Sequence, residues 1–131
     1  MKSKTMTAIL YALGVYHFAT GVMAYFMTGF FYEKFTAHTG PLNNHFLGDV
    51  GAAYLTAGVA LLLAAYIEKW RIPFSVSAAL FLGLHSLIHI TEMATGQLQN
   101  MQVASDLVTV ILPTVFVGAV VYYASKSANR Q

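Results

Sequence analysis

The sequence contains no cysteine and little charge. Without cysteine the chain can form no disulfide and offers no thiolate as a nucleophile or metal ligand. Only 9% of its 131 residues are charged, whereas 57% are hydrophobic and the mean hydropathy is +0.61. This balance is too apolar for an ordinary soluble domain of this length, so a membrane protein is the leading class. The sequence also lacks a basic stripe interleaved with aromatic residues, which argues against a nucleic-acid partner.

Four apolar segments fill most of the chain. They run over residues 6–31, 45–66, 72–95 and 103–124, and each exceeds the roughly 20 residues that a helix needs to cross a bilayer. The first begins "MKSK" like a secretory signal, but its apolar stretch is longer than the roughly 7–15 residues of a signal. The turns "HTGPLNN", "EKWRIP" and "TGQLQNMQ" separate the segments. We therefore predict one all-α domain over residues 1–131, an integral membrane four-helix bundle in up-down-up-down order.

The basic residues predict how this bundle is oriented in the lipid bilayer. Six of them would lie on the side of the chain termini: Lys2, Lys4, Lys69, Arg71, Lys126 and Arg130. Only Lys34 falls on the other side. Lysine and arginine are enriched in cytoplasmic segments. We therefore expect both termini in the cytoplasm of a bacterium and the other face of the inner membrane protein toward the periplasm.

Ligand-type side chains recur inside two of the segments at helical spacing. In "HSLIHITEM", His85, His89 and Glu92 stand at i, i+4 and i+7, and His45 and Asp49 form another i, i+4 pair. Counting about 1.5 Å of rise per residue from the expected outer ends brings six such residues into one half of the bundle. These six residues are His45, Asp49, His85, His89, Glu92 and Asp106.

The chemistry of this group points to a metal. Histidines at i and i+4 can reach one ion from a single helix, and helical bundles build metal sites from inward side chains. Imidazole and carboxylate ligands suit zinc, iron or copper. The sequence predicts a transition-metal site with the ligands His45, Asp49, His85, His89 and Glu92, with Asp106 as a further candidate. A metal-dependent oxidoreductase or hydrolase is one function that such a site would serve.

Other interpretations of the same residues stay open, so whether the chain is an enzyme is undecided. The histidines and carboxylates could relay protons or other ions, or stabilise a partner in an accessory subunit without metal. Asp49 and Asp106 could instead lie near helix N-termini, where the dipole favours negative charge. His17 lies at a depth near that of His85, as a haem with two histidine ligands would require. We favour a hydrogen-bonded core histidine at position 17 over haem.

Two further features are structural. Small residues line the second segment, among them Gly51, Gly58 and Ala57, which favours close helix packing. Pro113 cannot donate a hydrogen bond to the carbonyl of Thr109, so we expect the fourth helix to kink or open there.

The second and third segments carry a resemblance. "NNHFLGDVGAAYLTAGVALLLAA" followed by "LHSLIHITEM" resembles small bacterial four-span membrane proteins that are DoxX-like in layout. In these, H-x3-D-x-G opens helix two and H-x3-H-x2-H lies on helix three. His45, Asp49, Gly51, His85 and His89 match this pattern, and Glu92 replaces the third histidine. The resemblance implies a four-helix membrane fold and lends no activity. Small four-span proteins often assemble, so the chain could form a homo-oligomer or join a larger membrane complex, although no residue of the sequence indicates either.

Overall fold

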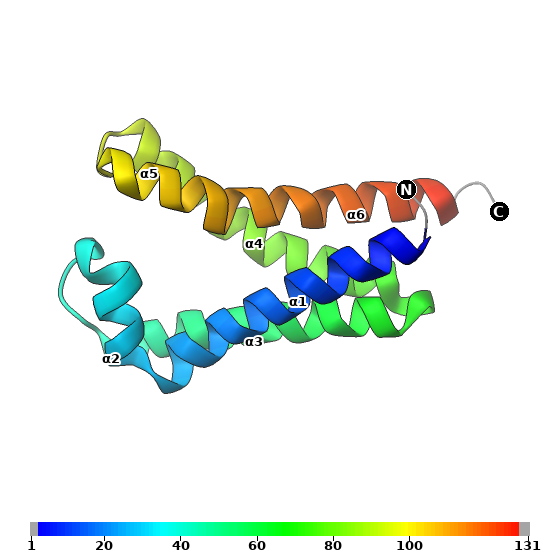
Figure 1. The fold of residues 1–131 in the computed structure, drawn as a ribbon, viewed down its shortest axis with the longest axis horizontal. Helices are drawn as coiled ribbons and strands as arrows, with labels where there is room; N and C mark the ends of the chain where they lie inside the picture. The colour runs from blue at the N-terminus through cyan, green and yellow to red at the C-terminus, as the bar shows by residue number, and fades with distance from the viewer. Residues whose placement is uncertain (1–2, 129–131) are drawn as a thin grey trace.

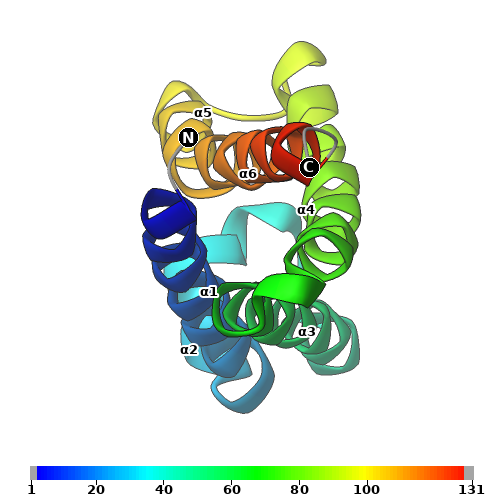
Figure 2. The ribbon, with the colours of Figure 1, turned by 90° about the vertical axis from the view of Figure 1, so that its right-hand side faces the viewer.

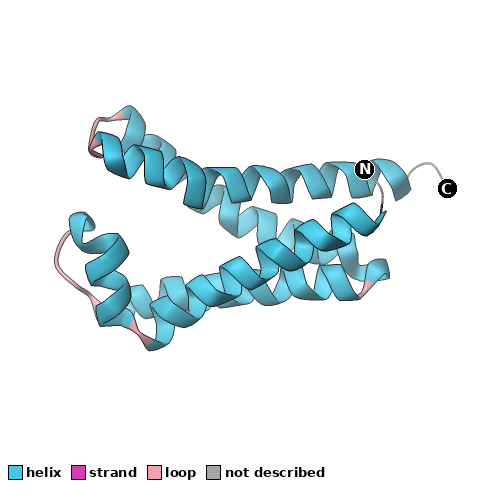
Figure 3. Ribbon diagram, in the orientation of Figure 1, coloured by secondary structure: helices cyan, strands magenta, loops and turns pink. Residues whose placement is uncertain are grey.

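The computed structural model describes residues 3–128, and this part of the chain is helical without a strand, as the sequence predicts (Figure 3). In chain order the elements are α1 (Ser3–Phe26), α2 (Thr28–Phe31), the π-helix η1 (Tyr32–Thr36), the 3-10 helix η2 (Ala37–Thr39), α3 (Asn44–Tyr66), the 3-10 helix η3 (Glu68–Trp70), α4 (Arg71–Ala94), α5 (Asn100–Asp106), the π-helix η4 (Leu107–Ile111) and α6 (Leu112–Ala128). Four helical stretches are long and apolar enough to cross a membrane, namely Lys4–Phe26, Asn44–Tyr66, Glu68–Ala94 and Asn100–Ala128.

The long helices run side by side along one axis. The start of α1, the end of α6 and the junction of α3 with α4 lie at one end of the bundle, which we call the terminal end (Figure 1). The opposite, loop end holds α2 and the start of α5. Viewed along the axis, α1, α3, α4 and α6 form a ring (Figure 2). Neighbours pack closely around it except for α1 and α6, which contact each other far less than α1 contacts α3.

Glycines bring the backbones of α1 and α3 together. A Cβ atom added to Gly58 would lie 2.5 Å from the backbone nitrogen of Phe18, and one added to Gly51 would lie 2.6 Å from that of Tyr25. From the other side, a Cβ atom on Gly21 would lie 2.5 Å from the nitrogen of Leu55. Any side chain would force the two helices apart. The small residues of the second segment therefore serve the close packing that the sequence predicts.

An apolar core fills the terminal half of the bundle. Its largest fully buried members come from all four long helices and are Leu10, Leu61, Leu82, Val117 and Val120. Each of these residues lies nearer the terminal end than the polar residues of its own or a neighbouring helix. The core therefore separates the polar side chains of the loop half from the terminal end.

The helix ends follow local signals. The side chain of Asn43 caps α3 by accepting a hydrogen bond from the backbone of Phe46 at 3.0 Å. Gly96 follows α4 with φ of 71°, a left-handed conformation that glycine adopts without strain.

Several boundaries differ from the prediction; the first helix begins at Ser3 instead of residue 6 and the last ends at Ala128 instead of residue 124. Two of the shifts have a local cause. α1 ends at Phe26 instead of Phe31, because Met27 leaves the helical region with φ of −128° and ψ of 44°. The last span begins at Asn100 instead of residue 103, because Gln99 and Gln102 exchange hydrogen bonds with each other's backbone in a capping box.

The last span opens next to its proline, as predicted. Leu107–Ile111 forms a π-helix, and α6 resumes with Pro113 in its first turn. The carbonyl of Thr109, which Pro113 cannot pair, accepts a hydrogen bond from the Tyr16 hydroxyl at 2.8 Å. This bond ties α1 to the last span across the least packed side of the ring.

Candidate functional site

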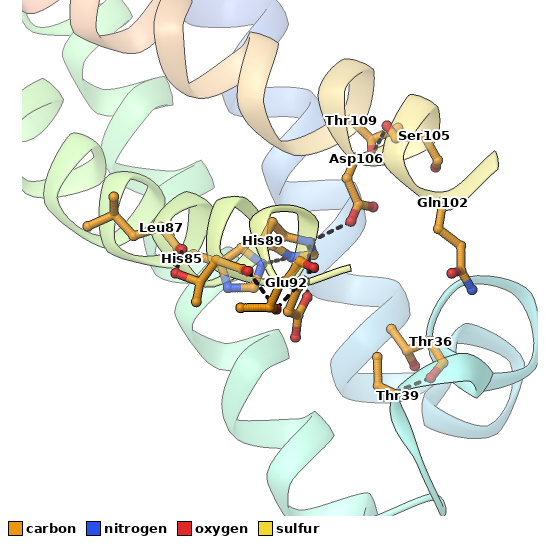
Figure 4. A network of polar contacts seen from close by, with 12 residues as sticks. Thr36, Thr39, His85, Leu87, His89, Glu92, Gln102, Ser105, Asp106 and Thr109 are labelled. Atoms are coloured by element: carbon orange, nitrogen blue, oxygen red, sulfur yellow. Dashed lines mark hydrogen bonds and ion pairs between the residues drawn. The ribbon is translucent and has the colours of Figure 1, made fainter. Parts of the chain in front are cut away.

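A hydrogen-bonded chain of polar side chains joins α4 to α5 (Figure 4). Nδ1 of His89 lies 2.7 Å from Oδ2 of Asp106, and Nε2 of His89 lies 3.1 Å from Nε2 of His85. His89 and Asp106 are largely buried, and His85 is half-buried. Since α4 ends at Ala94, the rise per residue places His85 about 14 Å inward from that end. The chain of contacts therefore leads from the loop half toward the middle of the bundle.

The carboxylate of Asp106 sets the tautomer of His89. As long as the Asp106 carboxylate is ionised it only accepts hydrogen bonds, so Nδ1 of His89 then carries a proton and donates it. If His89 is neutral, its Nε2 has the lone pair and Nε2 of His85 is the donor across the 3.1 Å contact. Each of the two contacts from Asp106 to His85 then pairs one hydrogen-bond donor with one acceptor.

Glu92 lies at the edge of this arrangement. Its Oε2 is 3.9 Å from Nδ1 of His89, which is an ion-pair distance and too long for a hydrogen bond. It sits on the Asp106 side of the His89 ring, toward the loop end. We call His85, His89, Glu92 and Asp106 the polar layer.

Aromatic rings close the inner side of the polar layer. The Tyr54 ring meets the His85 ring edge-on at 5.3 Å and stacks on the His17 ring at 5.7 Å. Tyr54 was not singled out in the sequence, although it is the only aromatic residue among the small residues of "GAAYLTAGVA". It joins the histidine of α1 to the histidines of α4.

His17 differs from its expected state. The side chain is buried with 1% exposure, as a core histidine would be, but neither ring nitrogen has a hydrogen-bond partner among the described residues. An unpaired buried polar group costs roughly 1–3 kcal/mol. The buried ring of His17 therefore lowers the stability of the folded protein.

His45 and Asp49 lie outside the polar layer. They contact each other, with Nε2 of His45 at 3.5 Å from Oδ2 of Asp49, but their side chains are 91% and 69% exposed. Both side chains are exposed although Asp49, five residues from the start of α3, shares the depth of His89, five residues from the end of α4. The structure thus brings together His85, His89, Glu92 and Asp106 and leaves this pair on the surface of α3.

Asp106 does not lie at the start of its helix, where the sequence allowed it to interact with the helix dipole. α5 begins at Asn100, so Asp106 lies nearly two turns inside the helix, where its carboxylate pairs with His89 instead of capping backbone groups. Within residues 3–128, no group of three or more histidine, aspartate or glutamate side chains is arranged to hold a metal ion.

The pair of histidines by itself has a partly suitable geometry for metal. Ligand nitrogens about 2.1 Å from one ion would be separated by roughly 3.0–3.4 Å, and the two Nε2 atoms are 3.1 Å apart. Asp106 would then hold His89 from the far side of its ring, as carboxylates do behind metal-binding histidines. Glu92 is on that same far side, so it supplies no third ligand to the space between the Nε2 atoms.

Comparison with known proteins adds no family. The chain matches no protein-family model, no curated protein and no solved structure.

Proposed function

We propose that this chain is an accessory membrane protein that moves protons between one face of the bilayer and its middle. The observation that carries the proposal is the unbroken contact series from Asp106 through His89 to His85, with separations of 2.7 and 3.1 Å. Ionisable residues inside a membrane are costly and typically serve ion or proton pathways. The four membrane-crossing helices provide the setting for such a pathway.

The proton steps balance as follows. When His85 takes up a second proton, its Nε2 proton passes to Nε2 of His89, and the Nδ1 proton of His89 passes to Oδ2 of Asp106. The charged pair of His85 and Asp106 becomes neutral, and Asp106 then releases its proton toward the loop end. The forward steps leave both rings in the opposite tautomer, with the proton of His89 on Nε2 and that of His85 on Nδ1. Run backward from that state, the same steps load a proton from Asp106 onto His85 and restore the first tautomers. Each transfer occurs along a contact already within hydrogen-bond distance.

The pathway ends inside the bundle. Beyond Tyr54 and His17 the interior holds the apolar core of Leu10, Leu61, Leu82, Val117 and Val120. The hydroxyl of Ser75 is buried on the same side but has no hydrogen-bond partner among the described residues, so it does not extend the contact series. A proton relay with one open side does not conduct across the membrane. It supplies or removes protons for a group at the middle of the bilayer, as an accessory subunit would do.

The orientation follows from charge. Lys4, Lys69, Arg71 and Lys126 belong to the terminal end and Lys34 to the loop end, whereas Lys2 and Arg130 lie outside the described residues. With positive charge in the cytoplasm, the bundle is up-down-up-down with cytoplasmic termini, and the polar layer faces the periplasm of a bacterial inner membrane. We include in this proposal that the chain is related to the DoxX-like four-span proteins that its second and third segments resemble.

Nitrogen-15 NMR of histidine-labelled protein in liposomes tests the relay. We expect His89 to carry its proton on Nδ1, and exchange of the His85 ring proton with deuterated buffer to be fast. Asp106→Leu should remove the tautomer preference and slow this exchange by roughly 100-fold, the low end of what a positioned acid–base group contributes. Asp106→Asn should keep the acceptor, and with it the tautomer, but slow the exchange.

Asp49→Leu is the matched control, because it removes a carboxylate that pairs with a histidine at the surface. It should leave the signals of His85 and His89 unchanged. Unaltered exchange at His85 in Asp106→Leu, or an equal effect of Asp49→Leu, would exclude Asp106 as the proton entry.

A metal centre is the second candidate, favoured by the separation of the two Nε2 atoms and by Asp106 behind His89. Zinc, iron or copper would be held by His85 and His89 and would need further ligands from water, substrate or another chain, leaving open positions for a reaction. Elemental analysis of protein purified without chelators tests it. This candidate predicts stoichiometric metal that His89→Ala removes and His45→Ala keeps, and a metal between the two Nε2 atoms would exclude proton transfer across that contact. Metal-free wild-type protein would refute this candidate and leave the relay standing.

A further inference from the structure

A pocket of about 430 Å³ opens at the terminal end, away from the polar layer. It lies where α1 passes the end of α3 and the start of α4. Its walls carry two cations, one carboxylate, one hydroxyl and two phenol rings, contributed by Lys4, Arg71, Glu68, Thr7, Tyr11 and Tyr66. The proton relay makes no use of this pocket.

Arg71 forms a fixed positive wall. Its side chain is buried, with 5% exposure of the residue, and its guanidinium is held from three helical elements. It donates to Oγ1 of Thr7 at 2.9 Å, to Oε1 of Glu68 at 3.1 Å and to the carbonyl of Ala64 at 3.3 Å. These bonds hold the cation in place at the wall of an open pocket.

The charges of the walls do not balance. Glu68 pairs with Arg71, but its side chain is 73% exposed, and Lys4 adds a second, exposed cation. Among the residues of 3–128 that line the pocket, two cations thus stand against one carboxylate. Arginine and lysine together with a hydroxyl group form a suitable donor set for a phosphate.

The position of the pocket indicates that the phosphate belongs to a lipid headgroup. The span of α1 begins at Lys4 and that of α3 ends at Tyr66, so the pocket lies at the level of the lipid headgroups. Tyr11 and Tyr66 are exposed, as aromatic residues at membrane interfaces are. Basic pockets between membrane helices bind anionic headgroups.

We propose that this pocket binds the phosphate of an anionic phospholipid. The phosphodiester accepts from the Lys4 ammonium, the Arg71 guanidinium lies behind it, and the acyl chains follow the lipid-facing sides of α1 and α3. The same groups would also donate hydrogen bonds to free inorganic phosphate, so the two sources must be separated by experiment.

Native mass spectrometry of the full chain in detergent provides the test, with phosphatidylglycerol, phosphatidylcholine and inorganic phosphate as separate probes. We expect one phosphatidylglycerol to be retained in preference to phosphatidylcholine. Lys4→Gln should weaken its binding about fivefold, since a basic residue near an anionic lipid surface contributes roughly 1 kcal/mol. Thr7→Val, which keeps the shape of the side chain, should weaken it in the same direction.

Lys126→Gln is the control, because Lys126 is an exposed lysine at the same end that lies over the Tyr122 ring, outside the pocket. It should change phosphatidylglycerol binding less than twofold. Equal losses in Lys4→Gln and Lys126→Gln, or equal binding of the two lipids by the wild type, would overturn the site. Tighter binding of inorganic phosphate than of phosphatidylglycerol, lost in Lys4→Gln, would overturn the lipid as its occupant.

Discussion

The close contact of α1 and α3 makes Gly58→Ala a sharp test of how this bundle is held together. The added Cβ atom would lie 2.5 Å from the nitrogen, 2.7 Å from the Cα atom and 2.9 Å from the Cβ atom of Phe18. The nearest two of these atoms belong to the backbone, so no rotation of a side chain relieves the clash. The helices must separate by about 1 Å to reach ordinary contact distances, and overpacking of this kind costs roughly 1–3 kcal/mol.

Gly118→Ala in α6 is the matched control. A Cβ atom there meets no atom within 4 Å, and the residue lies inside a helix like Gly58. Both substitutions gain the same helix preference of alanine over glycine, roughly 0.5–1 kcal/mol. The difference in unfolding free energy between the two variants therefore isolates the clash, and we expect it to be about 1–3 kcal/mol, with Gly58→Ala the less stable.

Reversible unfolding in mixed micelles, followed by circular dichroism, measures this difference. The same ranking should hold for Gly51→Ala against Gly83→Ala, because Gly51 meets the backbone of Tyr25 and Gly83 meets no atom within 4 Å. If Gly58→Ala proves as stable as Gly118→Ala, the backbones of α1 and α3 are not in contact, and the argument for a glycine-dependent pair fails.

Three further predictions concern single polar groups. Tyr16→Phe should destabilise the protein by about 1 kcal/mol through loss of its bond to the Thr109 carbonyl. In a Pro113→Ala background, which restores a backbone donor for that carbonyl, the loss should be smaller. If a double-mutant cycle gives the same loss in both backgrounds, Tyr16 does not compensate for Pro113. His17→Leu should raise the unfolding free energy by roughly 1–3 kcal/mol because it removes a buried group without a partner, and a loss of stability would reveal a partner for the ring. Asn43→Ala should cost about 1 kcal/mol through loss of the α3 cap, whereas Asn43→Asp, which keeps an acceptor, should retain it.

Much of the fold could be predicted from composition and turn signals. Apolar length locates the four spans, and the glycine and asparagine residues of the turns separate them, where the structure has the Asn43 cap and the end of α4 before Gly96. Apolarity does not report whether a helix is continuous, so the break at Met27 inside an apolar run was missed. The early start of α5 was missed because a glutamine is an uncommon N-cap, and the Gln99 capping box departs from the usual sequence pattern.

The candidate site was predictable in depth but not in direction. Counting the rise per residue correctly placed His85, His89 and Asp106 near one another, and the i, i+4 spacing correctly placed the two histidines on one face. Depth says nothing about which way a helix is rotated. Asp49 shares the level of His89, yet its side chain and that of His45 are exposed. The rotation of α3 follows from its buried face, which includes Gly51 and Gly58 packed against α1.

The π-helix before Pro113 has a consequence for how the last span can change. Leu107–Ile111 contains one residue more per turn than an α-helix, so it rotates everything on its loop side by about 100° relative to α6. Deleting one residue there would leave Val117 and Val120 in the core but turn Asp106 away from His89. The rotation of the helix half that carries Asp106 can therefore change independently of the half that packs in the core. A change in the length of this segment is enough for that, and no side chain has to be replaced.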